Sequence, residues 1–242
     1  MGHTMVICII PARYGSTRLP GKPLIVIGNK PLVMWTYNRA AESGIFDDVY
    51  VATDDRRIAD TVIHNGGKAI MTADSHISGT DRVREAVADI ECDYVVNVQG
   101  DEPDIPVTLL KMLHGKLAQL DDNSLLTCVS HANAADAANK NVVKAVLNSR
   151  QQALYFSRAP IPCDRNGKPG IFLKHRGIYA FTKKGLERFC GLPHGELEQR
   201  EKLEQLRALE YGMNIQCFLY DYKGIGIDTP DDVEHFKTLA GE

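Results

Sequence analysis

Short apolar runs alternate with helical patterns along the first half of this chain, and this alternation limits the possible folds more than any other feature. The runs lie at Val6–Ile10, Val49–Ala52, Tyr94–Val98 and Leu125–Val129. Strands that are buried on both faces of a parallel sheet have this continuous apolar character. Strands that alternate with helices need crossover connections, so we expect an α/β fold with a doubly wound, mainly parallel sheet. Ligands of such sheets bind at the carboxyl ends of the strands.

The second half of the chain has a different character. Proline and glycine recur between residues 131 and 170 among β-rich pieces such as Val142–Leu147, and further β-like pieces follow at Ile178–Phe181 and Ile215–Leu219. We therefore expect a single domain of residues 1–242 with a smaller, partly antiparallel, β-rich subdomain inserted at about residues 131–190.

Two helices are predicted after this insertion. Leu203, Leu206 and Leu209 are flanked by charged residues and followed by Gly212, a pattern that predicts a helix ending at this glycine. The segment Thr229-Pro230-Asp231-Asp232 is typical of a helix start, with threonine as N-cap, proline at N1 and aspartate at N3.

Charge and cysteine content exclude several classes of protein. The 242 residues include 28 Lys plus Arg and 31 Asp plus Glu, a net charge of −3, which disfavours a general nucleic-acid binder. Six scattered cysteines form no CxxC pair, so we expect free thiols in a reducing compartment. The apolar run Val6–Ile10 is too short to span a bilayer and lacks the features of a signal peptide. These features predict a cytoplasmic protein without membrane association.

The loop after the first predicted strand favours phosphate binding. It carries three cations and no acid, and Gly15 and Gly21 let its backbone approach a ligand closely. The cations are Arg13, Arg18 and Lys22. Five residues separate Gly15 from Gly21 and Pro23 follows the lysine, so the loop is neither a Walker A motif nor a GxGxxG fingerprint. The alternative is a solvated loop without a ligand.

Polar side chains follow the predicted strand at Tyr94–Val98. Asp101 is a hard oxygen ligand suited to Mg²⁺, and Gln99 can both donate and accept hydrogen bonds, as recognition of a base requires. Asp228 is a second carboxylate candidate. The alternatives are a plain turn at Gly100-Asp101 with Asp101 as a helix cap, and a helix-capping role for Asp228. Two carboxylates on one Mg²⁺ beside a basic loop would suit phosphoryl or nucleotidyl transfer.

Other polar residues carry weaker signals. Ser78 precedes a predicted helix and offers a hydroxyl to a base or a ribose, but the same residue is ordinary at a helix start. His175 stands at a strand entry lined with polar rings. The Glu204–Arg207 segment is expected to form a solvated helix face.

These motifs, taken in order, resemble the 3-deoxy-manno-octulosonate (Kdo) cytidylyltransferases, also called CMP-Kdo synthetases. The resemblance extends over nearly the whole chain. It rests on the segments 10–24, 51–55, 78–82, 97–103, 153–162, 177–180, 203–207 and 228–230.

The resemblance implies that the protein is a nucleotidyltransferase. Such an enzyme couples CTP to the anomeric hydroxyl of a 3-deoxy-2-ulosonic acid, with Kdo as the first choice, and yields a CMP-sugar and pyrophosphate. The product serves lipopolysaccharide or capsule synthesis. The family is typically homodimeric, with the inserted subdomain at the contact, and uses Mg²⁺.

Residue roles also come from the resemblance. The nucleotide is expected to contact Pro11, Ala12, Arg13, Arg18, Lys22, Ser78 and Gln99, with Arg13, Arg18 and Lys22 on the triphosphate and Ser78 and Gln99 at the cytidine. The Mg²⁺ ligands are expected to be Asp101 and Asp228. The residues expected to act on the reacting phosphates are Arg13, Lys22, Asp101 and Asp228. The sugar acid is expected to contact Arg158, His175, Tyr179, Glu204 and Gln205.

Three positions depart from the usual family pattern. Arg176 stands where an aliphatic residue is usual, Asp104 follows the Glu-Pro pair, and Thr182 replaces a common arginine. They cluster near the sugar-side motifs, so the acceptor could be Kdo, 8-amino-Kdo or another ulosonic acid. Two other hypotheses are a nucleotidyltransferase for a sugar 1-phosphate and a non-catalytic CTP-binding module.

Overall fold

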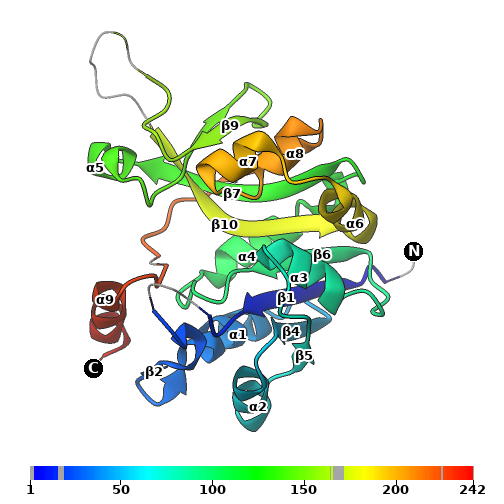
Figure 1. Ribbon diagram of the computed structural model, residues 1–242, viewed down its shortest axis with the longest axis vertical. Coiled ribbons are helices and arrows are strands. Elements are labelled where there is room, and N and C mark those ends of the chain that lie inside the picture. The colour runs from blue at the N-terminus through cyan, green and yellow to red at the C-terminus, as the bar shows by residue number, and fades with distance from the viewer. Residues whose placement is uncertain (1–2, 16–18, 164, 166–171, 225, 242) are drawn as a thin grey trace. The chain divides into compact units, whose positions relative to one another are not determined.

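The computed structural model describes residues 3–15, 19–163, 165, 172–224 and 226–241 (Figure 1). The chain divides into two compact units. Unit 1 combines Met1–Gly115 with Lys223–Glu242, and unit 2 is the continuous segment Lys116–Tyr222. The insertion expected at about residues 131–190 lies inside unit 2, and the single-domain division with a dimerisation subdomain stays a prediction.

Four strands of unit 1 pair with one another in parallel. They are β1 (Val6–Ala12), β4 (Asp48–Thr53), β5 (Ala69–Met71) and β6 (Tyr94–Val98). Their order is β6-β1-β4-β5, with Cys8 opposite Val49 on one side and Val96 on the other. The apolar runs that predicted β1, β4 and β6 are buried, as expected for strands covered on both faces.

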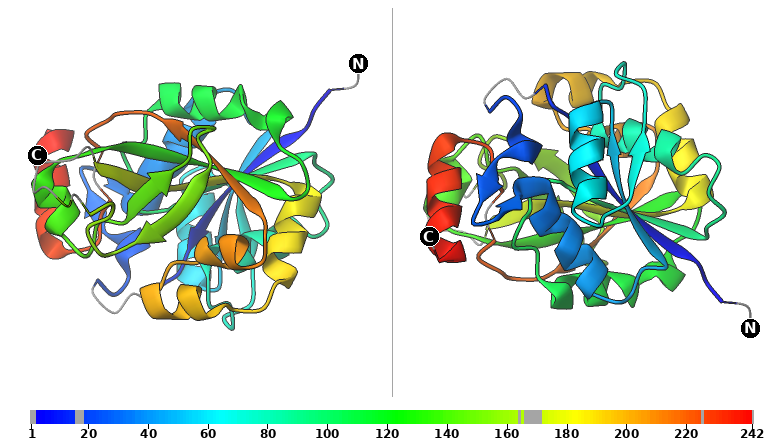
Figure 2. Two further views of the ribbon diagram at one scale, coloured as in Figure 1. Left: turned by 90° about the horizontal axis from the view of Figure 1, so that it is seen from above. Right: turned by 90° about the horizontal axis from the view of Figure 1, so that it is seen from below.

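The strand order of unit 1 reverses at β1. The chain moves outward from β1 to β4 and β5 and then returns to β6 on the other side of β1. Because crossovers of this kind are right-handed, the helices before and after the reversal lie on opposite faces. Figure 2 shows α1 (Leu32–Glu42) and α3 (Gly79–Ala86) on opposite faces of these strands. The predicted α/β, doubly wound class is confirmed.

The remaining elements of unit 1 surround this sheet. They are η1 (Lys22–Leu24), β2 (Val26–Ile27), β3 (Lys30–Pro31), α2 (Arg56–His64), α4 (Val107–His114) and α9 (Pro230–Ala240). The predicted start of α9 is confirmed, because the side chains of Thr229 and Asp232 form a capping box.

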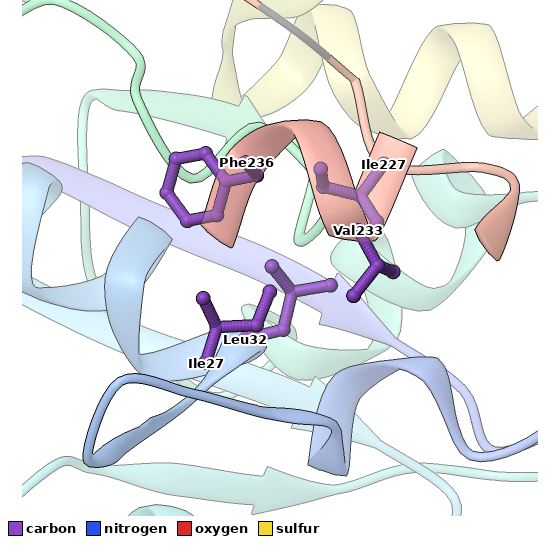
Figure 3. Close-up of a cluster of buried hydrophobic side chains, with 5 residues drawn as sticks. All are labelled: Ile27, Leu32, Ile227, Val233 and Phe236. Carbon is purple, nitrogen blue, oxygen red and sulfur yellow. The ribbon is translucent and has the colours of Figure 1, made fainter. Parts of the chain in front are cut away.

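Apolar side chains hold α9 against the rest of unit 1. Ile227, Val233 and Phe236 pack with Ile27 and Leu32 in a buried cluster (Figure 3), and the rings of Phe236 and Trp35 meet edge to face. A helix that lies late in the chain is thereby fixed to the β2–β3 hairpin and α1.

Unit 2 is a mixed sheet with helices. It contains η2 (Leu117–Gln119), β7 (Ser124–Ala132), α5 (Ala134–Ala138), β8 (Lys144–Leu147), β9 (Ala153–Ser157), β10 (Phe172–Thr182), α6 (Lys183–Gly191), α7 (Glu196–Glu201), α8 (Leu206–Glu210) and β11 (Asn214–Leu219). Strand β11 pairs in parallel with β7, whereas β7, β10, β8 and β9 pair antiparallel in that order. The predicted partly antiparallel character is thus present.

The helix predicted around Leu203, Leu206 and Leu209 is interrupted. Helix α7 ends where Lys202 adopts a left-handed conformation with φ of 55°, and α8 begins at Leu206. Arg158 accounts for the break, because its guanidinium donates to the carbonyl oxygens of Glu201 at 2.8 Å and Lys202 at 3.4 Å. Glu204 and Gln205 therefore lie in the turn before α8, and the prediction that they lie on a helix was wrong.

The structure describes the state of the cysteines and the length of the helices. All six cysteines are free thiols, and burial raises the pKa of Cys8. Across the part of the chain that the structure describes, no helix is both long enough and apolar enough to cross a membrane.

Candidate active site

A pocket opens in unit 1 where the strand order reverses, at the carboxyl ends of β1 and β6. Its volume is about 260 Å³, close to the lower end of the range for ligand sites. Such a reversal is the usual ligand position in sheets of this class. The lining residues are Pro11, Ala12, Arg13, Lys22, Pro23, His76, Ile77, Ser78, Gly79, Arg82, Gln99, Gly100, Asp101 and Asp228.

Eight of the residues expected at the nucleotide or the metal line this one pocket. They are Pro11, Ala12, Arg13, Lys22, Ser78, Gln99, Asp101 and Asp228. Arg18, the remaining expected residue, lies outside the described residues. The structure thus brings together side chains from four distant segments, although their individual roles stay predictions.

Lys22 joins the two predicted metal ligands. Its Nζ donates to Asp101 Oδ2 at 2.7 Å, to the carbonyl oxygen of Ile227 at 2.7 Å and to Asp228 Oδ1 at 3.1 Å. The lysine side chain is 15% exposed, while those of Asp101 and Asp228 are 29% and 45% exposed. Burial disfavours the charged ammonium, but the two carboxylates outweigh it and raise the pKa of Lys22. This lysine therefore remains a cation at neutral pH.

The two carboxylates suit a divalent cation that also binds phosphate. They converge on one point, the position that the Lys22 ammonium takes here, and both supply hard oxygen ligands. Among the described residues, no group of three or more His, Cys, Asp or Glu side chains is arranged to hold a metal. A cation held by these two carboxylates would draw its remaining ligands from a triphosphate and water, as Mg²⁺ usually does.

The local backbone explains how Lys22 reaches the carboxylates. Gly21 adopts a left-handed conformation with φ of 68° and begins the short helix η1, whose first residue is Lys22. The N–H of Gly21 donates to the carbonyl oxygen of Tyr14 at 3.0 Å. A Cβ at Gly21 would come within 3.1 Å of the Tyr14 ring, so this position favours glycine twice over.

A chain of hydrogen bonds fixes the amide at the end of β6. Asn97, fully buried, donates to Thr80 Oγ1 at 3.1 Å and accepts from Gln99 Nε2 at 3.2 Å. The bond to Asn97 fixes the side-chain amide of Gln99, and the direction of its side-chain carbonyl group is fixed with it. Ser78 caps α3, because its Oγ accepts from the backbone N–H of Asp81 at 3.1 Å. The helix-start interpretation of Ser78 is correct, and the same residue also lines the pocket.

Sequence reasoning missed Arg82 and His76, two residues that line the pocket. Arg82 is buried and donates to Thr72 Oγ1 at 2.6 Å, and it pairs with Asp54 at 3.2 Å. His76 contacts Glu85 through its Nε2. Arg82 lies one helical turn after Ser78, which was the available signal. No pattern in the sequence pointed to His76.

A second cluster of predicted residues lies in unit 2. His175 Nε2 lies 2.9 Å from Thr127 Oγ1, and its Nδ1 lies 3.5 Å from Gln205 Nε2. The Tyr179 hydroxyl donates to Gln205 Oε1 at 3.2 Å, and the rings of His175 and Tyr179 are 5.4 Å apart. Glu204 lies near enough to contribute to the raised pKa of Tyr179, whose largest cause is burial.

The hydrogen bonds assign one tautomer to His175. The Thr127 hydroxyl lies 2.7 Å from the carbonyl oxygen of Ile178 and donates to it, so Thr127 Oγ1 accepts from His175 Nε2. Nδ1 is then the acceptor for the Gln205 amide. Burial lowers the pKa of His175 to about 3, and the positive charge of Arg176 adds to the effect. The ring is therefore neutral at physiological pH and contributes dipoles rather than charge to this cluster.

Arg158 does not join this cluster. Its guanidinium donates to the carbonyl oxygens of Glu201, Lys140 and Lys202 at 2.8, 3.1 and 3.4 Å. The contacts stabilise the turn that leads to Glu204 and Gln205. Arg207, expected on a solvated face, is buried against Glu198, so that expectation was wrong.

Comparison with known proteins shows the family to which this chain belongs. The cytidylyltransferase family model matches residues 7–215. A 3-deoxy-manno-octulosonate cytidylyltransferase of Escherichia coli is 46% identical over 239 residues, which cover 98% of this chain and 96% of that protein. One from Thermodesulfovibrio yellowstonii is 46% identical over 244 residues, which cover 95% and 96%. This chain belongs to the 3-deoxy-manno-octulosonate cytidylyltransferase family.

One solved structure supports membership of the Kdo cytidylyltransferase family, and a more distant one shares the fold alone. A CMP:2-keto-3-deoxy-manno-octonic acid synthetase complexed with CTP superposes with a TM-score of 0.92 at 43% identity, over 98% of both chains. The 4-diphosphocytidyl-2C-methyl-D-erythritol synthase of Anaerococcus prevotii shares the fold, with a TM-score of 0.64 at 14% identity over 99% of both chains.

Two of the three departures from the usual Kdo cytidylyltransferase pattern have structural explanations here. Arg176 donates to Ser130 Oγ at 2.9 Å and to the carbonyl oxygen of Tyr222 at 2.7 Å, and its guanidinium lies over the Tyr222 ring. Thr182 caps α6 by accepting from the N–H of Gly185. Nothing in the structure explains Asp104. A link between these positions and the choice of sugar stays a prediction.

The neutral His175 makes stability depend on pH in this Kdo cytidylyltransferase. The folded state resists protonation down to pH about 3, whereas the unfolded histidine binds a proton below pH 6.5. The free energy of unfolding should therefore fall as pH drops below 6.5, by about 1 kcal/mol per pH unit. Urea denaturation at pH 7.0 and 5.5 should show a smaller loss for His175→Gln than for the unaltered protein. Equal losses in the two proteins would contradict this interpretation.

Proposed function

We propose that this protein activates Kdo with CTP. The anomeric hydroxyl of the sugar acid attacks the α-phosphorus of CTP, a bond forms between that oxygen and phosphorus, and pyrophosphate leaves. The products are CMP-Kdo and pyrophosphate. The proposal rests on the family and on the chain's relatives, which include a CMP-Kdo synthetase complexed with CTP.

The observation that carries the proposal is the convergence of Lys22, Asp101 and Asp228 in the pocket that Ser78 and Gln99 also line. Attack of an alcohol on a phosphate needs charge neutralisation and alignment more than a strong base. A pocket lined by cations, a pair of carboxylates and neutral polar groups suits a nucleoside triphosphate.

Each pocket residue then has a role in holding CTP. Lys22 and Arg13 bind the triphosphate, and Arg18 is assigned to it by the family resemblance. Gln99, whose amide is oriented by Asn97, and Ser78 face the cytidine, while Pro11 and Ala12 form the wall at the end of β1. The fixed amide of Gln99 favours one pattern of donors and acceptors on the base.

Cytidylyltransferases of this kind use a divalent cation, and we propose Mg²⁺ held by Asp101 and Asp228. Bound there, the cation would neutralise phosphate charge and lower the pKa of the attacking hydroxyl. Lys22 keeps its proton, because its pKa is raised, and so supplies a permanent positive charge to the same region.

The sugar acid is assigned to the residues of unit 2. Neutral His175, Tyr179, Gln205 and Glu204 offer donors and acceptors for hydroxyl groups. Arg158 supports the turn before Gln205 through the backbone carbonyls of Glu201 and Lys202. Its guanidinium lies near that turn, where it favours a carboxylate.

A second acceptor is 8-amino-Kdo. An 8-amino-3,8-dideoxy-manno-octulosonate cytidylyltransferase of Shewanella pealeana is 41% identical over 94% of this chain and 95% of that protein. That identity is close to the values for the Kdo enzymes, so the same chemistry on the amino sugar is the specific alternative.

Pyrophosphate release tests both acceptors directly. The protein is incubated with CTP and Mg²⁺ together with Kdo, 8-amino-Kdo, sialic acid or no acceptor. Release with Kdo supports the proposal, and release with the amino sugar but not with Kdo supports the alternative. Silence with every acceptor, in protein that is folded by circular dichroism, would refute both.

Assembly and location follow from the same proposal. We infer a homodimer in the cytoplasm, which the family resemblance implies. Large apolar side chains on strands of unit 2 support an interface there, since Leu154 on β9 and Leu219 on β11 are 58% and 43% exposed.

A further inference from the structure

Asp228 lies on a segment without regular secondary structure, yet its role requires a fixed position. It is the more exposed member of the carboxylate pair. A carboxylate on such a segment holds a metal well only when neighbouring groups restrict its backbone. Ile227 and Thr229, its neighbours in sequence, show how this restriction arises.

Ile227 ties the segment to the rest of the site. Its N–H donates to the carbonyl oxygen of Asp101 at 2.9 Å, and its own carbonyl oxygen accepts from Lys22 Nζ at 2.7 Å. Its side chain is fully buried in the cluster with Val233 and Phe236 (Figure 3). The backbone before Asp228 is thus linked to both the other carboxylate residue and the lysine.

Asp232 holds the backbone at Asp228 from the C-terminal side. One oxygen, Oδ2, accepts from the N–H of Asp228 at 3.0 Å, from the N–H of Thr229 at 2.8 Å and from Thr229 Oγ1 at 2.8 Å. A helix cap needs a bond to Thr229 alone. The additional bond to the N–H of Asp228 reaches one residue further, to the backbone of the predicted metal ligand.

We propose that Asp232 is a positioning residue that holds Asp228 in the geometry that binds the metal–CTP complex. This inference rests on the proposed function, because it takes Asp228 as a metal ligand. Asp232 touches neither metal nor substrate in this role. It acts by fixing the backbone of Asp228, while Ile227 fixes the preceding residue against Asp101 and Lys22.

The expected effect is a loss of metal affinity beyond any loss of stability. Removal of groups that orient metal ligands typically costs 10- to 100-fold in metal affinity or activity. Asp232→Ala should therefore weaken Mn²⁺ binding in the presence of CTP by about tenfold. Asp232→Asn keeps an oxygen acceptor at the same position and should recover most of the affinity.

Thr229→Ala is the matched control. It removes the hydroxyl that caps α9 but leaves the Asp232 carboxylate to accept from the N–H of Asp228. It should lower the melting temperature about as much as Asp232→Ala does. Its Mn²⁺ affinity should stay within about twofold of the unaltered protein, since the positioning bond is intact.

Mn²⁺ titration followed by electron paramagnetic resonance, with CTP and without acceptor, decides the question. A selective loss in Asp232→Ala supports the proposal, and equal affinities in Asp232→Ala and Thr229→Ala overturn it. If Asp232→Ala does not fold, Asp232→Glu replaces it. That variant keeps the charge but displaces the oxygen, so unchanged affinity in it overturns the proposal. Pyrophosphate release by the unaltered protein with Kdo tests the proposed function separately, because the titration needs no turnover.

Discussion

Replacing Lys22 with methionine is expected to lower kcat for CMP-Kdo formation by about 10²- to 10³-fold. That is the typical cost of removing one charge-stabilising donor from a reacting centre. Methionine matches the length of the lysine stem but cannot donate to Asp101, Asp228 or a phosphate. The two carboxylates, which converge on the ammonium within 2.7 and 3.1 Å, would also lose the cation between them.

Lys30→Met is the control for this experiment. Lys30 belongs to the same unit, and its ammonium lies over the Trp35 ring, 4.7 Å from the centroid, away from the residues that line the pocket. Its kcat should stay within about twofold of the unaltered protein, as expected for a substitution outside the site. Steady-state rates at saturating CTP, Mg²⁺ and Kdo give the comparison. A Lys22→Met enzyme that retains more than a tenth of the rate would remove Lys22 from the reacting centre.

Replacing Arg207 with methionine is expected to cost about 3–5 kcal/mol of unfolding free energy, because it leaves Glu198 buried without its ion partner. Arg207 donates to both carboxylate oxygens of Glu198, at 2.9 and 2.7 Å. Its guanidinium also lies over the Phe189 ring. Burial disfavours the ionised carboxylate, but Arg207 and His194 overcome this and lower the pKa of Glu198.

An exposed ion pair in α7, the helix that contains Glu198, provides a comparison at equal distance. Arg200 and Glu196 also lie 2.7 Å apart, but their side chains are 74% and 73% exposed, against 1% and 10% for Arg207 and Glu198. Arg200→Met should cost less than about 0.5 kcal/mol. Urea denaturation measures the unfolding free energy of both variants. Similar losses would show that burial does not determine how much an ion pair contributes to stability. Adding Glu198→Met to Arg207→Met should restore part of the stability, since no buried charge is left.

The sequence predicted those parts of the fold that depend on local pattern. Apolar runs identified β1, β4 and β6, because strands that are buried on both faces are mostly apolar. The start of α9 was equally local, since Thr229 and Asp232 cap it within four residues. The pocket was predictable because parallel strands bring their carboxyl ends together, although Lys22 is 79 residues from Asp101 and 206 from Asp228.

The errors arose where distant residues decide a local conformation. The break between α7 and α8 depends on Arg158, more than forty residues earlier, which takes the carbonyl groups at the end of α7. Arg207 was predicted to be solvated because Glu198, its partner, lies among other charged residues, and nothing in the sequence distinguishes it from them. His76 escaped notice because its partner Glu85 contributes no recognisable spacing.

The discontinuity of unit 1 has a consequence for how the protein is made. A ribosome delivers Ile27 and Leu32 long before Val233 and Phe236, which follow the whole of unit 2 in the chain. Until then, part of their shared apolar surface faces water or a transient cover, and nascent chains in that condition are prone to aggregate. Unit 2 is one continuous segment, so its folding does not depend on residues that are synthesised after it. The pocket receives Asp228 only after unit 2 has emerged, so vectorial synthesis adds this proposed metal ligand after the rest of the pocket.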